Sequence, residues 1–221
     1  MFKNIVKDHP NTYFTIKKNI GGFNYFALFE YYSRREFQAV PIEIETNRNE
    51  VYDFKNGLNT DLVANKIKNA LLNEFKDITQ EHRISIIPAS TKLKNAKRFY
   101  KFCEILSKEL VIVNSYESIV LAQDHEPTKG DANKNILEYL KFNQSYIGGK
   151  MFLFDDIKTT GRSFVQCADM LMKLGAEDVT GIFIGETYST YKNGYPKWYN
   201  EYKNYSDSTS KFLDDLFKKK P

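Results

Sequence analysis

Apolar and polar positions alternate in two different ways along the middle of the chain. Short apolar runs, which predict buried strands, lie at 84–88, 110–113, 151–154 and 179–185. Apolar residues at helical spacing follow Thr60, Lys92 and Ser163. Strands that alternate with helices in this way are typical of a mainly parallel sheet flanked by helices. The pattern therefore predicts an α/β fold for residues 56–187.

The first 55 residues have a different pattern, which we interpret as β-rich. Two aromatic runs, 13–16 and 23–32, flank Asn19-Ile20-Gly21-Gly22, a sequence that suits a hairpin turn. Residues 49–57 are polar and predict a link to the α/β core. We expect residues 1–55 to form an antiparallel flap packed on the main sheet. A hood that covers a substrate is the alternative interpretation.

Residues 188–221 form a third part, a tail in which aromatic residues are interspersed with lysines and asparagines. These aromatic residues are Tyr191, Tyr195, Trp198, Tyr199, Tyr202 and Tyr205. Aromatic side chains among cations can stack on the bases of single-stranded nucleic acid. A tail that wraps the domain, or a contact within a homodimer, explains the same residues at least as well.

The stretch 151–163 carries the clearest chemical signal in the chain. An apolar strand ends in the acids Asp155 and Asp156, and a turn rich in glycine and hydroxyl groups leads to the helical pattern after Ser163. Backbone N–H groups at a helix N-terminus favour an anion. Further donors are the hydroxyl groups of Thr159, Thr160 and Ser163. Gly161 allows the backbone to approach a ligand closely.

Two carboxylates beside an anion site repel a bare phosphate, so they require a neutral partner that donates hydrogen bonds. A ribose diol meets this requirement, because its hydroxyls donate to the carboxylates while its 5-phosphate occupies the turn. Other phosphate motifs fit less well. A Walker A loop needs Gly in place of Asp156 and Lys in place of Arg162, and no G-x-G-x-x-G follows a candidate strand. The acids also have no nearby His or Cys that would complete a zinc site.

The string Phe-Leu-Phe-Asp-Asp-Ile-Lys-Thr-Thr-Gly-Arg-Ser at 152–163 resembles the phosphoribosyl-pyrophosphate (PRPP) signature of type I phosphoribosyltransferases. The resemblance implies a type I phosphoribosyltransferase-like sheet. It also implies that the ribose and phosphate are bound by Asp155, Asp156, Lys158, Thr159, Thr160, Gly161, Arg162 and Ser163. The implied cofactor is Mg²⁺, held mainly through PRPP with the two acids nearby.

A second segment, Ala89-Ser90-Thr91-Lys92, follows the strand that ends near Pro88. By resemblance it corresponds to the loop that binds pyrophosphate, although Ser90 or Thr91 as a plain helix cap explains it about as well. The arrangement is most similar to the competence protein F branch, in which a basic segment and a Gly-Phe-Asn motif follow. Here Arg98-Phe99-Tyr100 replaces that motif, and the four-cysteine N-terminal zinc ribbon of many such proteins is missing.

Residues 121–135 are long, polar and rich in helix-breaking residues, as expected of a functional loop. The resemblance implies a catalytic loop that closes over PRPP, with Lys129 and Lys134 as cations for the departing pyrophosphate and His125 as a proton donor or acceptor. A solvated surface loop is the alternative. Past the last strand, Glu186 and Thr187 are weaker candidates for contact with a nucleobase.

Composition limits the partners and the location. The net charge of +4, from 32 basic and 28 acidic residues, is too small to indicate nucleic-acid binding by itself. Cys103 and Cys167 fall in apolar helical patterns, so we expect buried thiols rather than a disulfide. No apolar stretch approaches ~20 residues and no secretory signal opens the chain. We expect a cytoplasmic protein with no membrane partner.

The resulting functional expectation is an enzyme of nucleotide metabolism. It would transfer phosphoribosyl from Mg-bound PRPP to a nitrogen nucleophile, a nucleobase or an amine, and release pyrophosphate. The alternative is a non-catalytic regulator that binds PRPP or a nucleotide, or an accessory protein of competence or DNA processing. The acid pair and the phosphate loop suit either function, and the acceptor cannot be identified from the sequence.

Overall fold

The main sheet of the protein is mixed and mainly parallel, and β5 and β6 form a separate antiparallel pair. The structure is a computed structural model that describes residues 13–126 and 135–200. Within these residues, six strands lie in the order β1-β2-β8-β7-β3-β4. Their bounds are β1 Ile16–Ile20, β2 Phe23–Tyr31, β3 His82–Ile86, β4 Val113–Asn114, β7 Lys150–Lys158 and β8 Asp178–Thr187. Only β1 is antiparallel to its neighbour, whereas β2, β8, β7, β3 and β4 are parallel.

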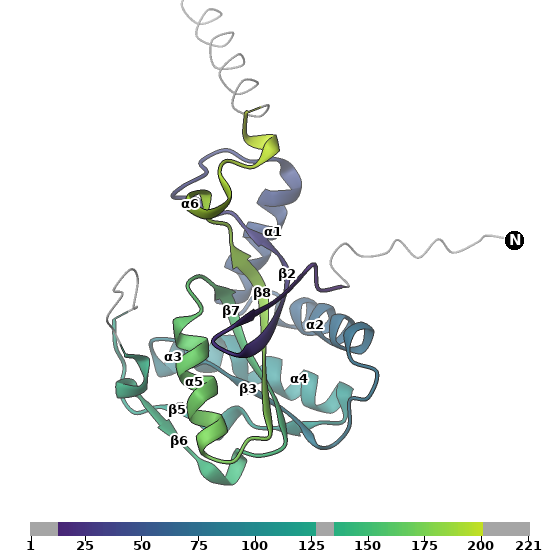
Figure 1. Cartoon of the computed structure of the whole chain (residues 1–221), viewed down its shortest axis with the longest axis vertical. Helices are drawn as coiled ribbons and strands as arrows, with labels where there is room; N and C mark the ends of the chain where they lie inside the picture. The colour runs from purple at the N-terminus through teal and green to yellow at the C-terminus, as the bar shows by residue number, and fades with distance from the viewer. Residues whose placement is uncertain (1–12, 127–134, 201–221) are drawn as a thin grey trace, which may run out of the picture.

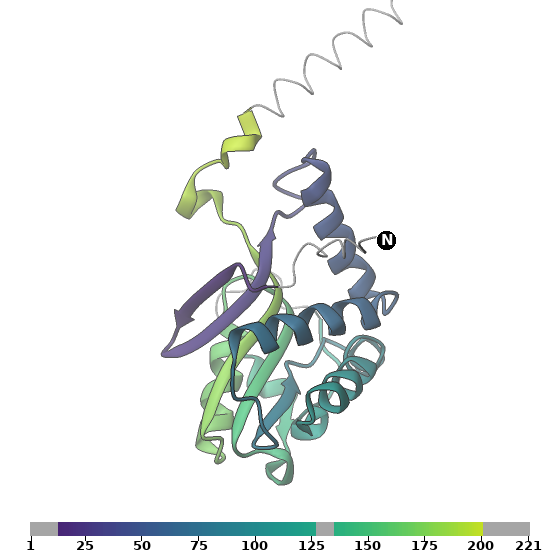
Figure 2. The same ribbon diagram turned by 90° about the vertical axis from the view of Figure 1, so that its right-hand side faces the viewer.

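Helices cover both faces of this sheet (Figures 1 and 2). One face carries α1 (Ile42–Lys55), α2 (Thr60–Glu74) and a run that passes from α3 (Lys92–Asn95) through the π-helix η1 (Ala96–Tyr100) into α4 (Lys101–Leu110). The other face carries α5 (Arg162–Lys173). The remaining short elements are β5 Ile119–Leu121, β6 Leu140–Phe142, η2 Tyr116–Ser118, η3 Ile136–Tyr139, η4 Gln144–Tyr146 and α6 Thr190–Asn193. The predicted α/β fold is therefore confirmed.

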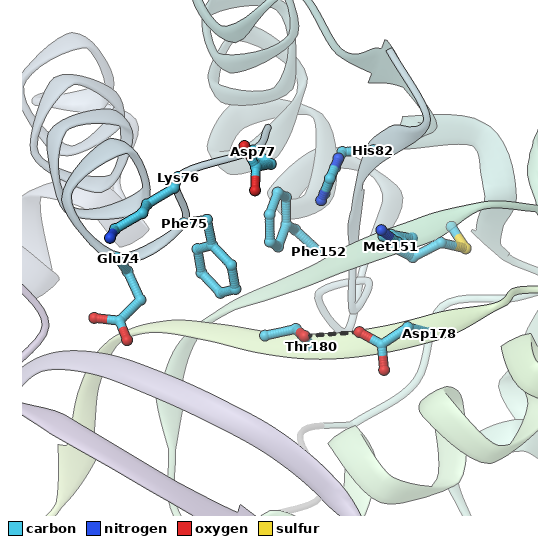
Figure 3. A pocket seen from close by; sticks show the side chains of 10 residues that line it. Glu74, Phe75, Lys76, Asp77, His82, Met151, Phe152, Asp178 and Thr180 are labelled. Carbon is cyan, nitrogen blue, oxygen red and sulfur yellow. Dashed lines mark hydrogen bonds between the residues drawn. The ribbon is translucent and has the colours of Figure 1, made fainter. Parts of the chain in front are cut away.

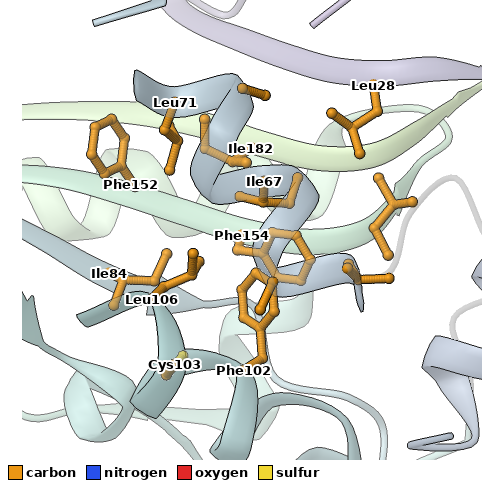
Figure 4. Packing of buried hydrophobic residues seen from close by; sticks show 14 of the residues in the cluster. Leu28, Ile67, Leu71, Ile84, Phe102, Cys103, Leu106, Phe152, Phe154 and Ile182 are labelled. Carbon is orange, nitrogen blue, oxygen red and sulfur yellow. The ribbon is translucent and has the colours of Figure 1, made fainter. Parts of the chain in front are cut away.

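The two faces of the sheet have separate apolar cores. On the α1, α2 and α4 face, the strand residues Phe152, Phe154 and Ile182 pack against helix residues such as Ile67 and Phe102 (Figure 4). The rings of Phe102 and Phe154 are stacked with centroids 4.0 Å apart. On the other face, α5 packs against residues of β7 and β8 that include Leu153 and Phe183. Because β7 is buried on both faces, its carboxyl end is held rigidly by two layers of helix.

The N-terminal segment differs from the β-rich flap that its sequence predicts. The expected hairpin is present as β1 and β2, but β2 pairs with β8 and so extends the main sheet instead of packing on its face. The prediction is wrong for Ile42–Lys55, including the supposed link at 49–55, which is the helix α1. Only a narrow stripe of this helix is buried, with Val51 and Phe54 as its apolar members. Such a sparse pattern resembles a polar link in the sequence because most positions face solvent.

An aromatic cluster joins the N-terminal segment to the start of the C-terminal tail. It contains Tyr32, Phe37, Val40, Ile44, Tyr188, Trp198 and Tyr199. Figure 1 shows α6 and the upper end of α1 beyond the carboxyl ends of β2 and β8. The described part of the tail therefore packs against the domain, while Tyr202 and Tyr205 lie outside the described residues.

Both cysteine thiols are free and buried, as their positions in the sequence predict. Burial raises the pKa of each thiol, so both remain protonated and unreactive. Across residues 13–126 and 135–200, no helix combines the length and apolar character needed to span a bilayer.

Candidate functional site

The two acids of the sequence motif lie within the last part of β7, at the carboxyl edge of the sheet. Side chains of a strand alternate between its faces, and the two acids follow this rule. Asp156 faces α1 and η1, where it meets Lys55 and Arg98. Asp155 lies on the face of α5, where its charge acts on the thiol of Cys167. The acid pair therefore presents one carboxyl group to each face.

The alternation of side chains between the two faces of β7 changes after the acids. The ladder between β7 and β8 pairs Asp155 and Ile157 with residues of β8 but gives Asp156 no partner. Ile157 then packs into the same core as Phe154, although regular alternation would turn it to the opposite face. This local irregularity also redirects Lys158 towards the hairpin of β1 and β2.

Asp156 is held by two cations that come from distant parts of the chain. Lys55 Nζ lies 3.2 Å from Oδ1, and Arg98 Nη1 lies 3.2 Å from Oδ2. The Nε–H of Arg98 also donates to the carbonyl oxygen of Lys55, at 2.9 Å. Arg98 belongs to the π-helix η1, and single π-turns are frequent at functional sites. Each oxygen of Asp156 thus has its own cation.

Asp155 has a different environment. Its Oδ1 accepts a hydrogen bond from the backbone N–H of Asp156, at 2.8 Å. Burial, and secondly the negative charge of Asp156, raise the pKa of the Asp155 carboxyl far above its usual range. The hydrogen bond from the Asp156 N–H and the charges of Lys55 and Arg98 oppose this rise. A ligand that donates hydrogen bonds, or a cation, would stabilise the ionised form of this carboxyl.

The phosphate-binding turn of the sequence prediction leads directly into α5. Gly161 is the N-cap of this 12-residue helix and has a φ of +78°. A Cβ atom there would lie 2.6 Å from Ile20 Cδ1, so both the conformation and the space require glycine. Thr159, Thr160 and Arg162 are exposed and Ser163 is half-buried. The first N–H groups of a helix have no partner within it, so this turn has the donors that an anion needs.

Lys158 is not available to a phosphate in this arrangement. Its Nζ donates to Glu186 Oε1 at 2.8 Å and lies 4.6 Å from the ring centroid of Tyr25, with the side chain 7% exposed. Glu186 also accepts from Lys18 Nζ at 2.7 Å and from the hydroxyl of Tyr25 at 2.8 Å. Burial opposes ionisation of Glu186, but the hydrogen bonds from Lys158 and Lys18 outweigh it and lower the pKa. Lys158 and Glu186 therefore connect β7, β8 and the hairpin.

The second predicted loop, Ala89–Lys92, lies beside the first because β3 and β7 are parallel neighbours. The backbone N–H of Ala89 donates to Asn95 Oδ1 at 3.1 Å, which fixes the loop to the following helix. Thr91 caps that helix, since its Oγ1 accepts from the N–H of Lys94 at 3.2 Å. The cap interpretation of Thr91 is thus correct, and it leaves a role in anion binding open. Lys92 is exposed at the start of the helix.

The polar loop after β5 also reaches this edge of the sheet. The N–H of His125 donates to the carbonyl oxygen of Ser90 at 2.9 Å. The imidazole of His125 packs against Tyr139 with centroids 4.4 Å apart, and its Nδ1 lies 2.7 Å from the carbonyl oxygen of Glu126. Since a carbonyl oxygen can only accept, Nδ1 carries the proton in this contact. Lys129 and Lys134 lie outside the described residues.

Three residues of this site had no distinct signal in the sequence. Asp124 Oδ1 accepts from the N–H of Lys92 at 2.9 Å, which places a carboxylate in the second loop. Lys55 was part of a presumed link, and Arg98 was one of several basic residues. Their roles depend on which side chains the fold brings together, and no local spacing encodes that.

A metal ion would have few protein ligands here. Among the described residues, no group of three or more His, Cys, Asp or Glu side chains could hold one. Both oxygens of Asp156 are paired with cations, so Asp155 is the remaining carboxyl of the motif. Mg²⁺ commonly binds through one or two carboxylates together with the phosphates of a substrate. The donor set fits an ion that arrives with a phosphorylated ligand.

Two cavities in the described part of the protein lie away from the acids. One, of about 320 Å³, is at the opposite edge of the sheet, where β3, β7 and β8 begin with His82, Lys150 and Asp178 (Figure 3). The other, of about 460 Å³, lies between the start of β1 and Trp198. The two loops beside the acid pair instead form a polar edge, at which Thr159, Thr160 and Lys92 are exposed. Comparison with known proteins gives no assignment, since no family model and no curated protein matches the chain.

Proposed function

We propose that the protein binds PRPP together with Mg²⁺ and transfers phosphoribosyl to a nitrogen nucleophile. The observation that carries this proposal is the position of the acid pair and the two loops on the adjacent parallel strands β3 and β7. In open α/β sheets, ligands bind outside the carboxyl ends of the strands. A phosphate at one loop, a diol at the acids and a diphosphate at the other loop match the order of groups in PRPP.

The turn at 159–163 would bind the 5-phosphate. Its helix N-terminus offers backbone N–H groups, and Gly161 gives the turn the positive φ that it needs. Asp155 would accept hydrogen bonds from the ribose hydroxyls, which also favours its ionised form. Asp156 lies on the other face of the strand, where Lys55 and Arg98 pair with its two oxygens.

The reaction requires charge stabilisation more than a protein nucleophile. Positive charge develops at the anomeric carbon while negative charge develops on pyrophosphate, and fixed charges placed against both lower the barrier. Mg²⁺, when bound, would neutralise part of the diphosphate charge. Lys92 at the second loop would add a cation to the leaving group, and Asp155 would lie near the positive centre. His125, fixed to Ser90, remains the candidate for proton transfer.

A regulator that binds PRPP without turnover is the second candidate function. It is favoured by one observation, the pairing of both Asp156 oxygens with Lys55 and Arg98. A carboxylate held in this way is poorly placed to take hydrogen bonds from ribose. A third candidate function is that of an accessory protein that binds nucleic acid. Such a protein would show salt-dependent oligonucleotide binding that is lost when residues 201–221 are deleted.

Calorimetric titration of the wild-type protein with PRPP, with and without Mg²⁺, tests the proposal. We expect Mg-dependent binding that is weakened at least tenfold in Asp155→Asn, whose side chain cannot accept as a charged group. Asp169→Asn, an exposed acid on α5, is the matched control. Absence of PRPP binding to the wild type would refute the proposed function. Pyrophosphate release on addition of nucleobases or amines then separates the enzyme from the regulator.

A further inference from the structure

Lys55 and Arg98 hold Asp156 unequally. Arg98 is 19% exposed and makes two contacts, one to Asp156 and one to the carbonyl oxygen of Lys55. The Lys55 side chain is 37% exposed, and its ammonium has the Asp156 carboxylate as its ion-pair partner. Both ion pairs have the same N–O distance of 3.2 Å, so the two cations differ in their exposure and in the second contact that Arg98 makes. Lys55 is therefore the cation that can leave at lower cost.

Asp156 needs one cation but not two. Its side chain is 8% exposed, and a buried carboxylate without a partner is strongly destabilising. Arg98 meets this need alone, because its contact with the Lys55 carbonyl fixes the guanidinium through the backbone of α1. The ammonium of Lys55 can move while the main chain of Lys55 stays in place.

The surroundings of Lys55 indicate which group it would meet. The chain after α1 packs on the π-helix, since a Cβ at Gly57 would lie 2.8 Å from the carbonyl oxygen of Lys97. This π-helix continues the helix that starts at the second loop. The turn at 159–163, by contrast, leads into α5 on the opposite face of the sheet. Lys55 thus lies on the face of the second loop and not on that of the 5-phosphate turn.

We infer that Lys55 is a specificity-determining residue that exchanges its ion pair with Asp156 for one with the diphosphate of the ligand. This inference rests on the proposed function and extends it. Arg98 keeps Asp156 compensated during the exchange. A ligand with the ribose 5-phosphate part alone does not engage Lys55, so the residue distinguishes the diphosphate ester from its monophosphate counterpart.

The experiment compares the affinities of two probes, PRPP with Mg²⁺ and ribose 5-phosphate, for the wild type and Lys55→Met. Methionine keeps most of the length of the side chain and removes its charge. We expect PRPP affinity to fall about 10- to 100-fold, as for the loss of a hydrogen bond to a charged group, with ribose 5-phosphate affinity changed less than about twofold. Lys55→Arg should retain most of the PRPP affinity. Lys108→Met, an exposed lysine near the far end of α4, is the charge-matched control.

Three results would contradict the inference, and they are distinguishable. Equal PRPP affinity in Lys55→Met and the wild type means that Lys55 does not contact the ligand. An equal loss for both probes means that Lys55 only supports the shape of the site. A wild type that binds neither probe refutes the proposed function itself, and with it the role of Lys55. Thermal unfolding of each variant shows whether it is folded, and Lys55→Gln replaces Lys55→Met if the latter is not.

Discussion

Arg98 Nη1 lies 3.2 Å from Asp156 Oδ2, so an ion pair joins a π-helical turn to the end of the central strand β7. The same guanidinium donates to the carbonyl oxygen of Lys55 at the last residue of α1. One side chain therefore connects two helices to the strand that carries the acid pair. This connection has consequences for stability as well as for binding.

Replacement of Arg98 by Ala should lower the free energy of unfolding by about 2–4 kcal/mol. Loss of one partner leaves a buried carboxylate with a weaker partner, and the partial exposure of Arg98 places the cost below that of a fully buried pair. Urea unfolding measures the change. In Arg98→Ala combined with Asp156→Asn the cost should be clearly less than the sum of the single costs, whereas strict additivity would show that the ion pair contributes nothing.

Replacement of Gly161 by Ala should impair both the fold and the phosphate turn. The φ of +78° costs an L-residue about 1–2 kcal/mol, and the contact with Ile20 adds a clash. Gly22→Ala is the control, because Gly22 also has a positive φ, +87°, but nothing lies within 4 Å of its Cβ position. We expect a larger loss of thermal stability in Gly161→Ala than in Gly22→Ala, and a loss of ribose 5-phosphate affinity in Gly161→Ala only. Similar losses in both would mean that the clash is relieved at no cost.

Asp155 should make the stability of the ligand-free protein decrease with rising pH. Its pKa is raised in the folded state, so the folded protein binds this proton more tightly than the unfolded chain does. The stabilisation that comes from the protonated carboxyl is fully present below the pKa of Asp in the unfolded chain, about 3.9. It is lost as pH rises towards the pKa in the folded state. The free energy of unfolding, measured with urea from about pH 4 to 8, should therefore decline less in Asp155→Asn than in the wild type. A wild type with the same pH slope as Asp155→Asn would contradict this.

Asp124 should compete with an anion at the second loop. Its carboxylate accepts from the N–H of Lys92, where the proposed function places pyrophosphate. Asp124→Ala should therefore raise the affinity for inorganic pyrophosphate several-fold, while the lost hydrogen bond lowers stability by about 0.5–1.5 kcal/mol. Asp124→Asn keeps the oxygen acceptor without the charge and should raise the affinity by a smaller factor. A lower pyrophosphate affinity in Asp124→Ala would show that the carboxylate assists the site.

The amino-acid sequence by itself determined the strands and helices with strong local patterns. β7 contains the apolar run Met151–Phe154, and α5 follows a turn in which glycine is required by a positive φ, so both could be predicted from neighbouring residues. The acid pair and the two loops could be placed at one edge because parallel strands end on the same side of a sheet. The helix α1 was missed, since its narrow buried stripe gives little periodic signal.

Only the tertiary structure decided the partners of the charged residues. Asp156 meets Lys55 and Arg98, and Lys158 meets Glu186, because helix packing and the change of alternation in β7 bring those side chains together. Long-range pairs of this kind depend on where each helix lies on the sheet, and the spacing of residues along the chain does not contain that information. The sequence thus predicted which residues bind a phosphorylated ribose, and the fold determined which of these side chains are already paired with other residues.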